Sequence, residues 1–179
     1  MISTSGALAW PDRPGGGAFQ ALFKAHDIER QYLTVVEGVV GPTSGTIDIP
    51  LVSDRGDLRR GVARGPARVA TPSRTTASSN GFGTVATLLA CWLETGRTHQ
   101  IRIHMAEMGH PVVGDPVYRP RNAPRCKARF HRQALHAQTL GFRHPITGDE
   151  IHVEAAPPTD LAALIVDLRN RYGLPNAGG

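Results

Sequence analysis

Residues 96–118 read GRTHQIRIHMAEMGHPVVGDPVY and gather polar side chains that are able to act on a ligand. The two arginines and three histidines of this stretch are Arg97, Arg102, His99, His104 and His110. An arginine fork holds the oxygens of a phosphate or carboxylate in pairs, and a histidine exchanges a proton near neutral pH. These residue types therefore suit anion binding or acid–base chemistry, although a solvated helix followed by a turn has the same composition.

The spacing of the apolar residues predicts that a helix carries these groups, beginning at Thr98 and ending at Gly109 in a left-handed turn. Its buried face is expected to hold Ile101, Met105 and Met108. Arg102 falls on an adjacent face near the helix start, where backbone N–H groups lack helical partners and favour anions. A solvated or structural role for Arg102 remains the alternative at this stage.

The histidine pattern does not favour a metal site. Ligands on one helix face need a spacing of four residues, whereas His99 and His104 are five apart and no cysteine or carboxylate completes a set. We therefore expect no metal, and histidines that form hydrogen bonds or contact a ligand. A hydrolase triad is also excluded, because the sequence has no G-x-S-x-G motif and Ser5 lies at its very start.

The composition is that of a globular domain with an excess of positive charge. Of the 179 residues, 40% are hydrophobic and 20% are charged, which argues against wholesale disorder, and the net charge is +5. Arginine carries most of this charge, so a polyanionic partner is one expectation, and scattered surface arginines that keep the protein in solution are the alternative. The two cysteines lack CxxC partners, and no disulfide framework is expected.

The chain length predicts a single domain over residues 1–172 with a flexible tail at 173–179. No apolar run is long enough to span a bilayer, and the start of the chain has neither the basic nor the apolar part of a secretory signal. We therefore expect a cytoplasmic protein without a membrane partner.

Strands are predicted on both sides of the chain that leads into the motif. β-Branched and aromatic residues predict a strand over residues 31–37, in which Tyr32 points away from the face of Leu33 and Val35. The apolar stretch 85–94 predicts a central strand that runs directly into the motif. The other elements predicted before it are a loop at 11–17, a helix at 18–27, a short strand at 46–51 stopped by Pro50, and a long polar hairpin excursion at 53–80.

A basic loop, two strands and a helix are predicted after the motif. Residues 119–132 hold six arginine or lysine side chains and two prolines, which favours an exposed basic loop. Residues 134–157 predict two strands around a turn at 145–149. Apolar residues at helical spacing predict a final helix over 161–172, with Thr159 as its N-cap.

The motif at 96–118 closely resembles the signature of the RluA-type pseudouridine synthases, which isomerise uridine in ribosomal or transfer RNA. Three further segments agree in order: T-S-G at 4–6, R-Q-Y-L-T-V-V-E-G at 30–38, and R-Q-A-L-H-A-Q-T-L-G-F-R-H-P-I-T-G at 132–148, followed by A-P-P. Together these segments span nearly the whole chain, and residues 53–80 are the part that agrees least.

The resemblance implies an α+β fold, with a mixed, largely antiparallel sheet, flanking helices and an RNA-binding cleft. It implies a cofactor-free isomerase that breaks the N-glycosidic bond of uridine, turns the base and rejoins it through carbon. Chemistry on a base requires that the base leave its stack, so a flipped uridine between basic walls is expected. The residues expected to contact RNA are Arg97, His99, Arg125, Lys127 and Arg129. We expect a monomer with RNA as its partner.

The resemblance also implies the roles of two catalytic residues. In the family, the arginine after H-Q-I pairs with a nucleophilic aspartate, and this arginine corresponds to Arg102. The tyrosine of R-Q-Y lies against the uracil and assists proton removal, and it corresponds to Tyr32. Because a free tyrosine has a pKa of about 10, stacking is the more secure of these two roles.

The nucleophile of the family is the aspartate of H-R-L-D-x-x-T-S-G, and that position falls at Met1. The resemblance therefore implies a domain that is incomplete at its N-terminus and inactive as it stands. Two explanations are open: a shortened form of an enzyme that carries the aspartate, which we favour because the other charged site groups are present, or a non-catalytic RNA-binding remnant. A third hypothesis, a basic structural RNA-binding module, gives no reason for Tyr32 and Arg102 to converge on one cleft.

Overall fold

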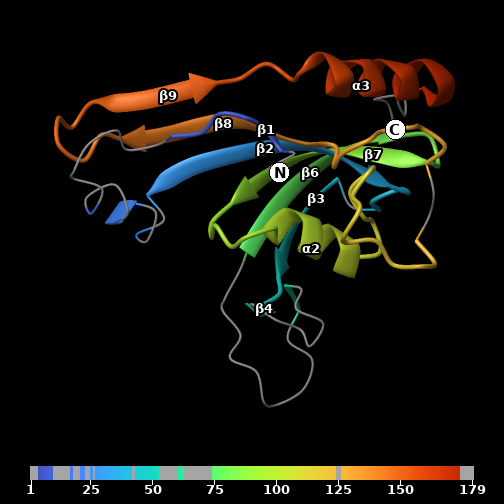
Figure 1. Cartoon of the computed structure of the whole chain (residues 1–179), viewed down its shortest axis with the longest axis horizontal. Coiled ribbons are helices and arrows are strands. Elements are labelled where there is room, and N and C mark those ends of the chain that lie inside the picture. Colours follow the sequence, from blue (N-terminus) through green and yellow to red (C-terminus); the bar gives the residue numbers. More distant parts are fainter. Residues whose placement is uncertain are drawn as a thin grey trace.

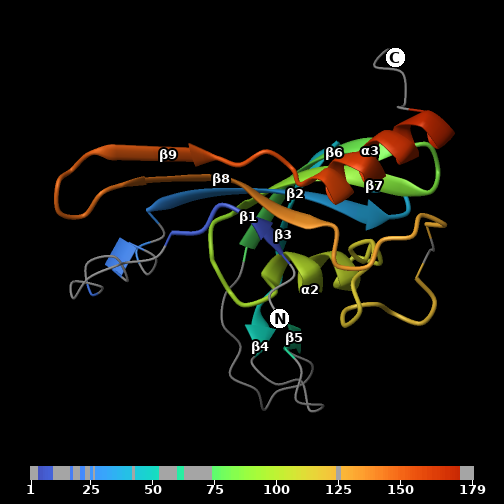
Figure 2. The same cartoon turned by 45° about the horizontal axis from the view of Figure 1, so that its top comes forward.

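A mixed β-sheet forms the centre of the protein. The computed structural model describes residues 4–9, 17, 21–22, 25, 27–41, 43–52, 60–62, 74–123 and 126–173. Within these residues, the strands of the main sheet are β1 (Ser5–Gly6), β2 (Ile28–Glu37), β3 (Ser44–Asp48), β6 (Arg74–Phe82), β7 (Ala86–Leu93), β8 (Leu135–Arg143) and β9 (Glu150–Glu154). Figures 1 and 2 show helix α2 (Gln100–Glu107) on one face of this sheet and helix α3 (Thr159–Tyr172) on the other.

The strands follow the order β1-β8-β2-β7-β6-β3, and β9 also pairs with β8. The pair β1·β8 is parallel and the remaining pairs of this sheet are antiparallel, so the predicted mixed, largely antiparallel sheet is confirmed. A second, two-stranded sheet of β4 (Leu51–Val52) and β5 (Gly61–Val62) lies beyond α2 in both views. Leu51 of this small sheet is buried with Ile103 of α2 and Tyr118.

The two helices bury apolar side chains against opposite faces of the sheet. Ile101 and Met105 of α2 are 3% exposed each, as the spacing predicts, and α3 buries three leucines in the same core. The third predicted core residue, Met108, is 53% exposed and the expectation for it is wrong. The physical reason is that α2 ends at Glu107, so Met108 is its C-cap: its backbone is still helical, with its N–H bonded to the carbonyl oxygen of His104, but Glu107, Met108 and Gly109 form an exposed helix end. Gly109 has a φ of 82°, the predicted left-handed conformation.

The hairpin excursion predicted at 53–80 lies largely outside the described residues, and the prediction missed the strand at its end. Its last part belongs to β6, a nine-residue strand that pairs with β3 on one side and β7 on the other. The sequence RTTASSNGF has little apolar periodicity, so its strand structure is imposed by two neighbouring strands rather than by its own composition. The strand predicted at 46–51 is divided at Pro50, with β3 before it and β4 after it.

The remaining predicted elements agree with the structure where it describes them. The strands predicted at 31–37 and 85–94 correspond to β2 and β7, and the turn at 145–149 joins β8 to β9. Thr159 is the first residue of α3 rather than its N-cap, because Pro158 is fixed in the extended conformation that precedes a helix. The helix predicted at 18–27 and the loop at 11–17 lie mostly outside the described residues. No helix of the described part is long and apolar enough to cross a membrane.

Candidate active site

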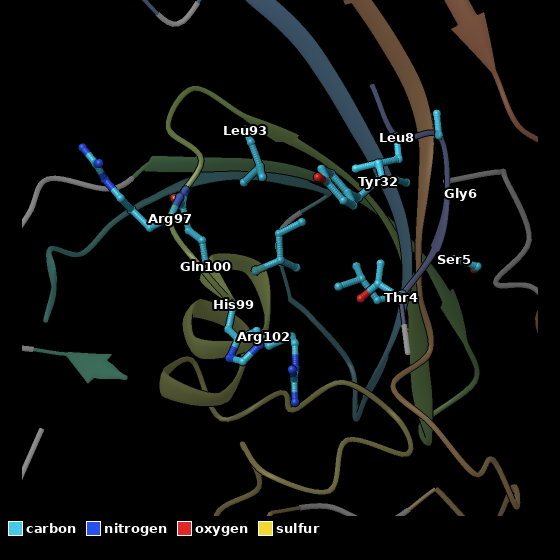
Figure 3. A pocket seen from close by; sticks show the side chains of 14 residues that line it. Thr4, Ser5, Gly6, Leu8, Tyr32, Leu93, Arg97, His99, Gln100 and Arg102 are labelled. Atoms are coloured by element: carbon cyan, nitrogen blue, oxygen red, sulfur yellow. The ribbon is translucent and has the colours of Figure 1, made fainter. Parts of the chain in front are cut away.

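A cleft of about 330 Å³ lies between the segment around β1, the middle of the sheet and the start of α2. Figure 3 shows residues that line it from these elements, among them Thr4, Leu8, Tyr32, His99 and Arg102, and at its edge Arg97, whose side chain extends away from the others. The structure thus brings together four of the sequence-predicted site residues, Tyr32, Arg97, His99 and Arg102. The hypothesis of a purely structural RNA-binding module gives no reason for this convergence.

Arg102 is buried, and it forms an ion pair with a carboxylate of its own motif. Its Nε donates to Oδ2 of Asp115 at 2.6 Å and its Nη2 to Oδ1 at 2.7 Å, and the two side chains are 7% and 0% exposed. The resemblance led us to expect that Arg102 pairs with a carboxylate that this chain lacks. Two of its nitrogens instead pair with Asp115 of the chain itself. Asp115 escapes sequence reasoning because it lies beyond the end of the helix, where no periodicity links it to Arg102.

Asp115 is held as a carboxylate by its hydrogen bonds. Burial acts to raise the pKa of Asp115, but hydrogen bonds from Arg102 and from the backbone N–H groups of Tyr118 and Val117 outweigh burial and bring the pKa below its ordinary value. The group is therefore ionised at neutral pH, and it fixes the plane of the Arg102 fork. The pair places a well-oriented cation at the wall of the cleft.

His99 stands immediately before α2 with a φ of 61°, in the left-handed region that side chains other than glycine rarely adopt. Its Nδ1 lies 3.0 Å from the hydroxyl of Tyr118, and the two rings meet edge to face with centroids 5.5 Å apart. The same Tyr118 ring lies 4.9 Å from the guanidinium carbon of Arg102. Burial, and then the cation of Arg102, lower the pKa of His99 by more than the carboxylate of Asp115 raises it, so its imidazole is neutral at pH 7.

The other two histidines of the motif are hydrogen-bonded within the protein. His104 is fully buried, and its ring nitrogens lie 3.0 Å from the Thr75 hydroxyl and 3.0 Å from a backbone carbonyl oxygen. His110 contacts the carbonyl oxygen of Glu37 at 3.0 Å. Within the described ranges, no three His, Cys, Asp or Glu side chains are grouped so as to hold a metal ion.

Tyr32 lines the cleft from β2, across from the start of α2. Burial raises the pKa of its phenol, and the Arg30 cation offsets part of this rise. The phenol is therefore protonated at neutral pH, which suits it to stack on a planar base rather than to take up a proton in the free protein. The raised pKa favours the stacking role, and both roles of Tyr32 remain predictions.

A family profile described as RNA pseudouridylate synthase matches residues 12–107, more than half of the chain. The chain belongs to this family. Its relatives include the Bacillus subtilis protein named uncharacterized RNA pseudouridine synthase YlyB, 43% identical over 143 residues, and ribosomal large subunit pseudouridine synthase D of Xanthomonas campestris, 41% identical over 155 residues. The RluA-type membership predicted from the motifs is thereby confirmed.

These alignments cover 79% and 81% of this chain but 45% of each relative, so the chain spans less than half the length of these two proteins. Its fold is also found in solved structures, among them those of two human proteins. Human RNA pseudouridylate synthase domain containing 4 has a TM-score of 0.70 at 20% identity and covers 93% of this chain and 70% of its own. Human RNA pseudouridylate synthase domain containing 1 has a TM-score of 0.66 at 24% identity, over 86% and 70%. The predicted α+β class is confirmed.

In this member of the pseudouridylate synthase family, the T-S-G segment forms one wall of the cleft. Gly6 has a φ of 117° and lies so close to β8 that a Cβ would be 2.1 Å from a carbonyl oxygen of that strand. The Ser5 hydroxyl lies 3.0 Å from Nδ1 of His136, and Figure 3 shows Ser5 turned away from the cleft. Met1, the position expected for the nucleophile, lies outside the described residues.

The basic loop at 119–132 forms neither helix nor strand in its described part, as predicted. The arginines at its two ends are tied to other parts of the molecule. Arg119 forms an ion pair with Glu37, with Nη2 2.7 Å from Oε2, and Arg132 donates to both carboxylate oxygens of Asp160 at 2.8 Å. The loop is therefore anchored at both ends by two of its own cations.

The cations predicted to bind RNA divide between the cleft and the loop. Arg97 is exposed and lines the cleft, whereas Lys127 and Arg129 are exposed on the loop and lie outside the cleft lining. Arg125 lies outside the described residues. Arg97 and His99 therefore line the same cleft as Arg102, whereas Lys127 and Arg129 do not line it.

The end of the loop is in direct contact with the turn that carries Asp115. Gly114, in this turn, has a φ of 74°, and a Cβ there would lie 2.1 Å from the carbonyl oxygen of Arg132. The carbonyl oxygen of Val113 accepts a hydrogen bond from the N–H of Ala134 at 2.8 Å. The backbones of the two segments thus touch without intervening side chains.

Proposed function

We propose that this chain is the catalytic-domain part of an RNA pseudouridine synthase that isomerises uridine to pseudouridine in ribosomal or transfer RNA. The observation that carries the proposal is the cleft shared by Tyr32 and Arg102, which come from separate elements. Relatives named ribosomal large subunit pseudouridine synthase D make ribosomal RNA the first substrate to test. The proposed unit is one domain over residues 1–172, in a monomeric, cytoplasmic protein.

The proposed reaction is an isomerisation in which the atoms balance. The bond from C1′ of the ribose to N1 of uracil breaks, the base turns in the cleft, and C1′ bonds to C5. The proton displaced from C5 leaves, and N1 acquires one. A cleft of about 330 Å³ falls within the range of small-ligand sites, ~300–1,000 Å³, and suits a base that has left its stack.

Each cleft residue has a proposed role in this reaction. Tyr32 stacks on the flipped uracil and keeps water from one of its faces. Arg102, held in place by Asp115, supplies the positive charge that faces the attacking carboxylate. Arg97 and His99 contact phosphates and sugars of the neighbouring nucleotides. The attacking carboxylate corresponds in the family motif to position 1, where this chain has Met.

A tritium-release assay tests the proposal, because the proton displaced from C5 of uridine passes into water. The 179-residue chain is expected to release no tritium from RNA labelled at C5 of its uridines. A second chain replaces Met1 with the tetrapeptide His-Arg-Leu-Asp behind a start methionine, and it is expected to release tritium. The same graft with Asn in place of Asp is the matched control. Release by the unchanged chain would show that the nucleophile lies elsewhere.

A non-catalytic RNA-binding role is the second candidate function. The net charge of +5 and the exposed side chains of Lys127 and Arg129 favour it. Under this hypothesis the grafted chain binds RNA but releases no tritium, whereas the isomerase proposal requires both. The two candidates are therefore separated by measuring binding and release on the same preparation.

RNA binding is tested by fluorescence anisotropy at several salt concentrations. Replacing Arg125, Lys127 and Arg129 with alanine is expected to weaken binding and to reduce the slope of log affinity against log salt by about 2 to 3, since each phosphate contact contributes ~0.7–0.9 units. The matched control removes the same charge elsewhere, by alanine at the exposed Arg143, Arg169 and Arg171. Equal losses in both chains would leave the loop as ordinary surface.

A further inference from the structure

Arg30 is a buried cation that the proposed mechanism does not use. It lies on β2 and is 8% exposed, and its Nη2 donates one long hydrogen bond of 3.3 Å to the carbonyl oxygen of Leu93. Its Nε is buried without a partner, and no carboxylate of the described residues pairs with it. A buried guanidinium is normally paired and hydrogen-bonded, so an uncompensated one calls for a physical reason.

Arg30 lies directly behind the wall of the candidate active site. Arg30 and Tyr32 are two residues apart on one strand, so their side chains leave the same face of the sheet. Leu93 lies between them, because it lines both the main cleft with Tyr32 and a second cleft, of about 450 Å³, with Arg30. Within the described residues, the titratable group that acts on Arg30 is the phenol of Tyr32.

Gly96 provides the room for this guanidinium. A Cβ at Gly96 would lie 2.2 Å from Nη1 of Arg30, so a side chain there would displace the cation. Gly96 belongs to the turn that connects Leu93 to Arg97 and leads into α2. Arg30 therefore contacts the turn that leads to Arg97 and Arg102, the two arginines of the cleft lining.

The surroundings of Arg30 do not suit an RNA phosphate. The second cleft is also lined by the carboxylates of Asp27, Glu29 and Glu94, and its other arginine, Arg143, is paired with Glu150. Three acidic side chains repel a phosphate at this place. We therefore expect the unpaired charge of Arg30 to act on a group of the protein itself rather than on RNA.

We propose that Arg30 is a positioning residue for Tyr32: its buried charge stabilises the phenolate that forms when the phenol loses its proton to water, and the phenolate oxygen then accepts the proton that leaves C5. This inference rests on the proposed function, since it explains how a stacking tyrosine also assists the removal of a proton from C5. Arg30 touches neither the base nor the nucleophile in this role. It acts through Tyr32 and through the turn at Gly96.

Arg30 lies on the same strand as Tyr32, and the other titratable groups around Tyr32 come from other elements. From the turn and α2 these groups are Arg97, His99 and Arg102, and from β7 the thiol of Cys91, whose pKa burial raises to about 12. The wall at residues 4–8 and the lining residues of β8 contribute no charged side chain. Burial raises the pKa of Tyr32 and Arg30 lowers it, so removal of Arg30 leaves the effect of burial unopposed.

The test measures the acidity of the phenol in the 179-residue chain itself. 3,5-Difluorotyrosine is introduced at position 32, because its phenol ionises at a lower pH, where the chain is not exposed to strong alkali, and ¹⁹F NMR follows its titration. Arg30→Met is expected to raise the pKa at position 32 by about one unit, because an opposite charge is lost. Arg30→Lys keeps the charge and is expected to restore most of the shift.

Gly96→Ala is a second variant that tests the inference even if Arg30→Met does not fold. It retains the Arg30 cation but displaces it, and it is expected to raise the pKa at position 32 by a smaller amount. A role of Arg30 in packing alone would destabilise the Met and Lys variants alike and leave the pKa unchanged. Identical titration curves for the unchanged chain and for Arg30→Met would overturn the inference.

Anisotropy with uridine-containing RNA separates this inference from the proposed function. A raised pKa with unchanged RNA affinity in Arg30→Met supports the positioning role. A loss of RNA affinity with an unchanged pKa would assign Arg30 to a phosphate and overturn it. Failure of the unchanged chain to bind RNA would count against the proposed function, and the titration would still report on Arg30 and Tyr32.

Discussion

Two arginine–aspartate pairs of this protein have nearly the same geometry and very different surroundings. Arg102 and Asp115 meet at 2.6 and 2.7 Å, with side chains that are 7% and 0% exposed. Arg132 and Asp160 meet through two bonds of 2.8 Å, with side chains that are 20% and 49% exposed. Because the bidentate contacts are alike, burial is the variable that separates them.

The difference in burial changes what each pair does. At Asp115, two backbone N–H groups complete the hydrogen bonds of a carboxylate that water does not reach. Asp160 is at the exposed start of α3, where the helix end favours a negative charge and where water screens its attraction to Arg132. The buried pair orients a cleft residue, and the exposed pair attaches a loop to a helix.

Removal of one carboxylate from each pair gives the largest expected contrast. Asp115→Asn leaves the guanidinium of Arg102 buried and uncompensated, and it is expected to lower the free energy of unfolding by ~3–5 kcal/mol. Asp160→Asn is the matched control, with an expected loss of about 1 kcal/mol or less. Urea denaturation measures both. Equal losses would mean that burial does not distinguish the pairs.

Replacement of both members of the buried pair sharpens the contrast. An Arg102→Met, Asp115→Leu chain contains no buried charge at this place, so it is expected to regain at least ~2 kcal/mol over Asp115→Asn. Its cleft has nonetheless lost a cation, so RNA binding is expected to fall although the fold is retained. A double variant as unstable as the single one would indicate that packing, rather than charge, accounts for the loss.

The pH dependence of stability provides a smaller effect with a definite sign. The unfolded chain binds a proton at Asp115 before the folded chain does, because the folded pKa is lowered. The stabilisation is therefore complete above the ordinary pKa of about 3.9 and is lost as the pH falls through the folded value. The difference between the unchanged chain and Asp115→Asn in urea denaturation is expected to narrow below about pH 4. A constant difference would contradict this.

Salt gives the smallest expected effect. Arg132→Ala is expected to lower the free energy of unfolding by less than about 1 kcal/mol. This loss is expected to shrink in about 0.5 M NaCl, because the pair is exposed and screened. The loss caused by Asp115→Asn is expected to change little with salt. Parallel responses of the two variants in thermal denaturation would argue that the Asp115 pair is reached by solvent.

The sequence predicted those features that depend on neighbouring positions. The strands at 31–37 and 85–94 follow from runs of apolar and β-branched residues, and the turn at 145–149 follows from its turn residues. Tyr32 and Arg102, which the motif match selected as site residues, both line one cleft. In each case a short stretch contains the deciding information.

Features that depend on distant partners could not be read in this way. Strand β6 has a polar sequence, and it is a strand because β3 and β7 pair with its two sides. Asp115 and Arg30 look like ordinary surface charges in the sequence, and only the folded chain reveals that one neutralises Arg102 and the other is buried beneath Gly96. Single-sequence patterns contain no signal for such contacts.

Gly114 connects the Arg102–Asp115 pair with the Arg132–Asp160 pair. The residue after it is Asp115, and the carbonyl oxygen that leaves no space for a side chain on it belongs to Arg132. A single methyl group at this point would force the loop and the turn apart and disturb both pairs together. Through the same contact, RNA that displaces the loop would also displace the carboxylate of Asp115 behind Arg102. Under the proposed function, RNA binding at the loop and the orientation of Arg102 in the cleft would therefore be coupled.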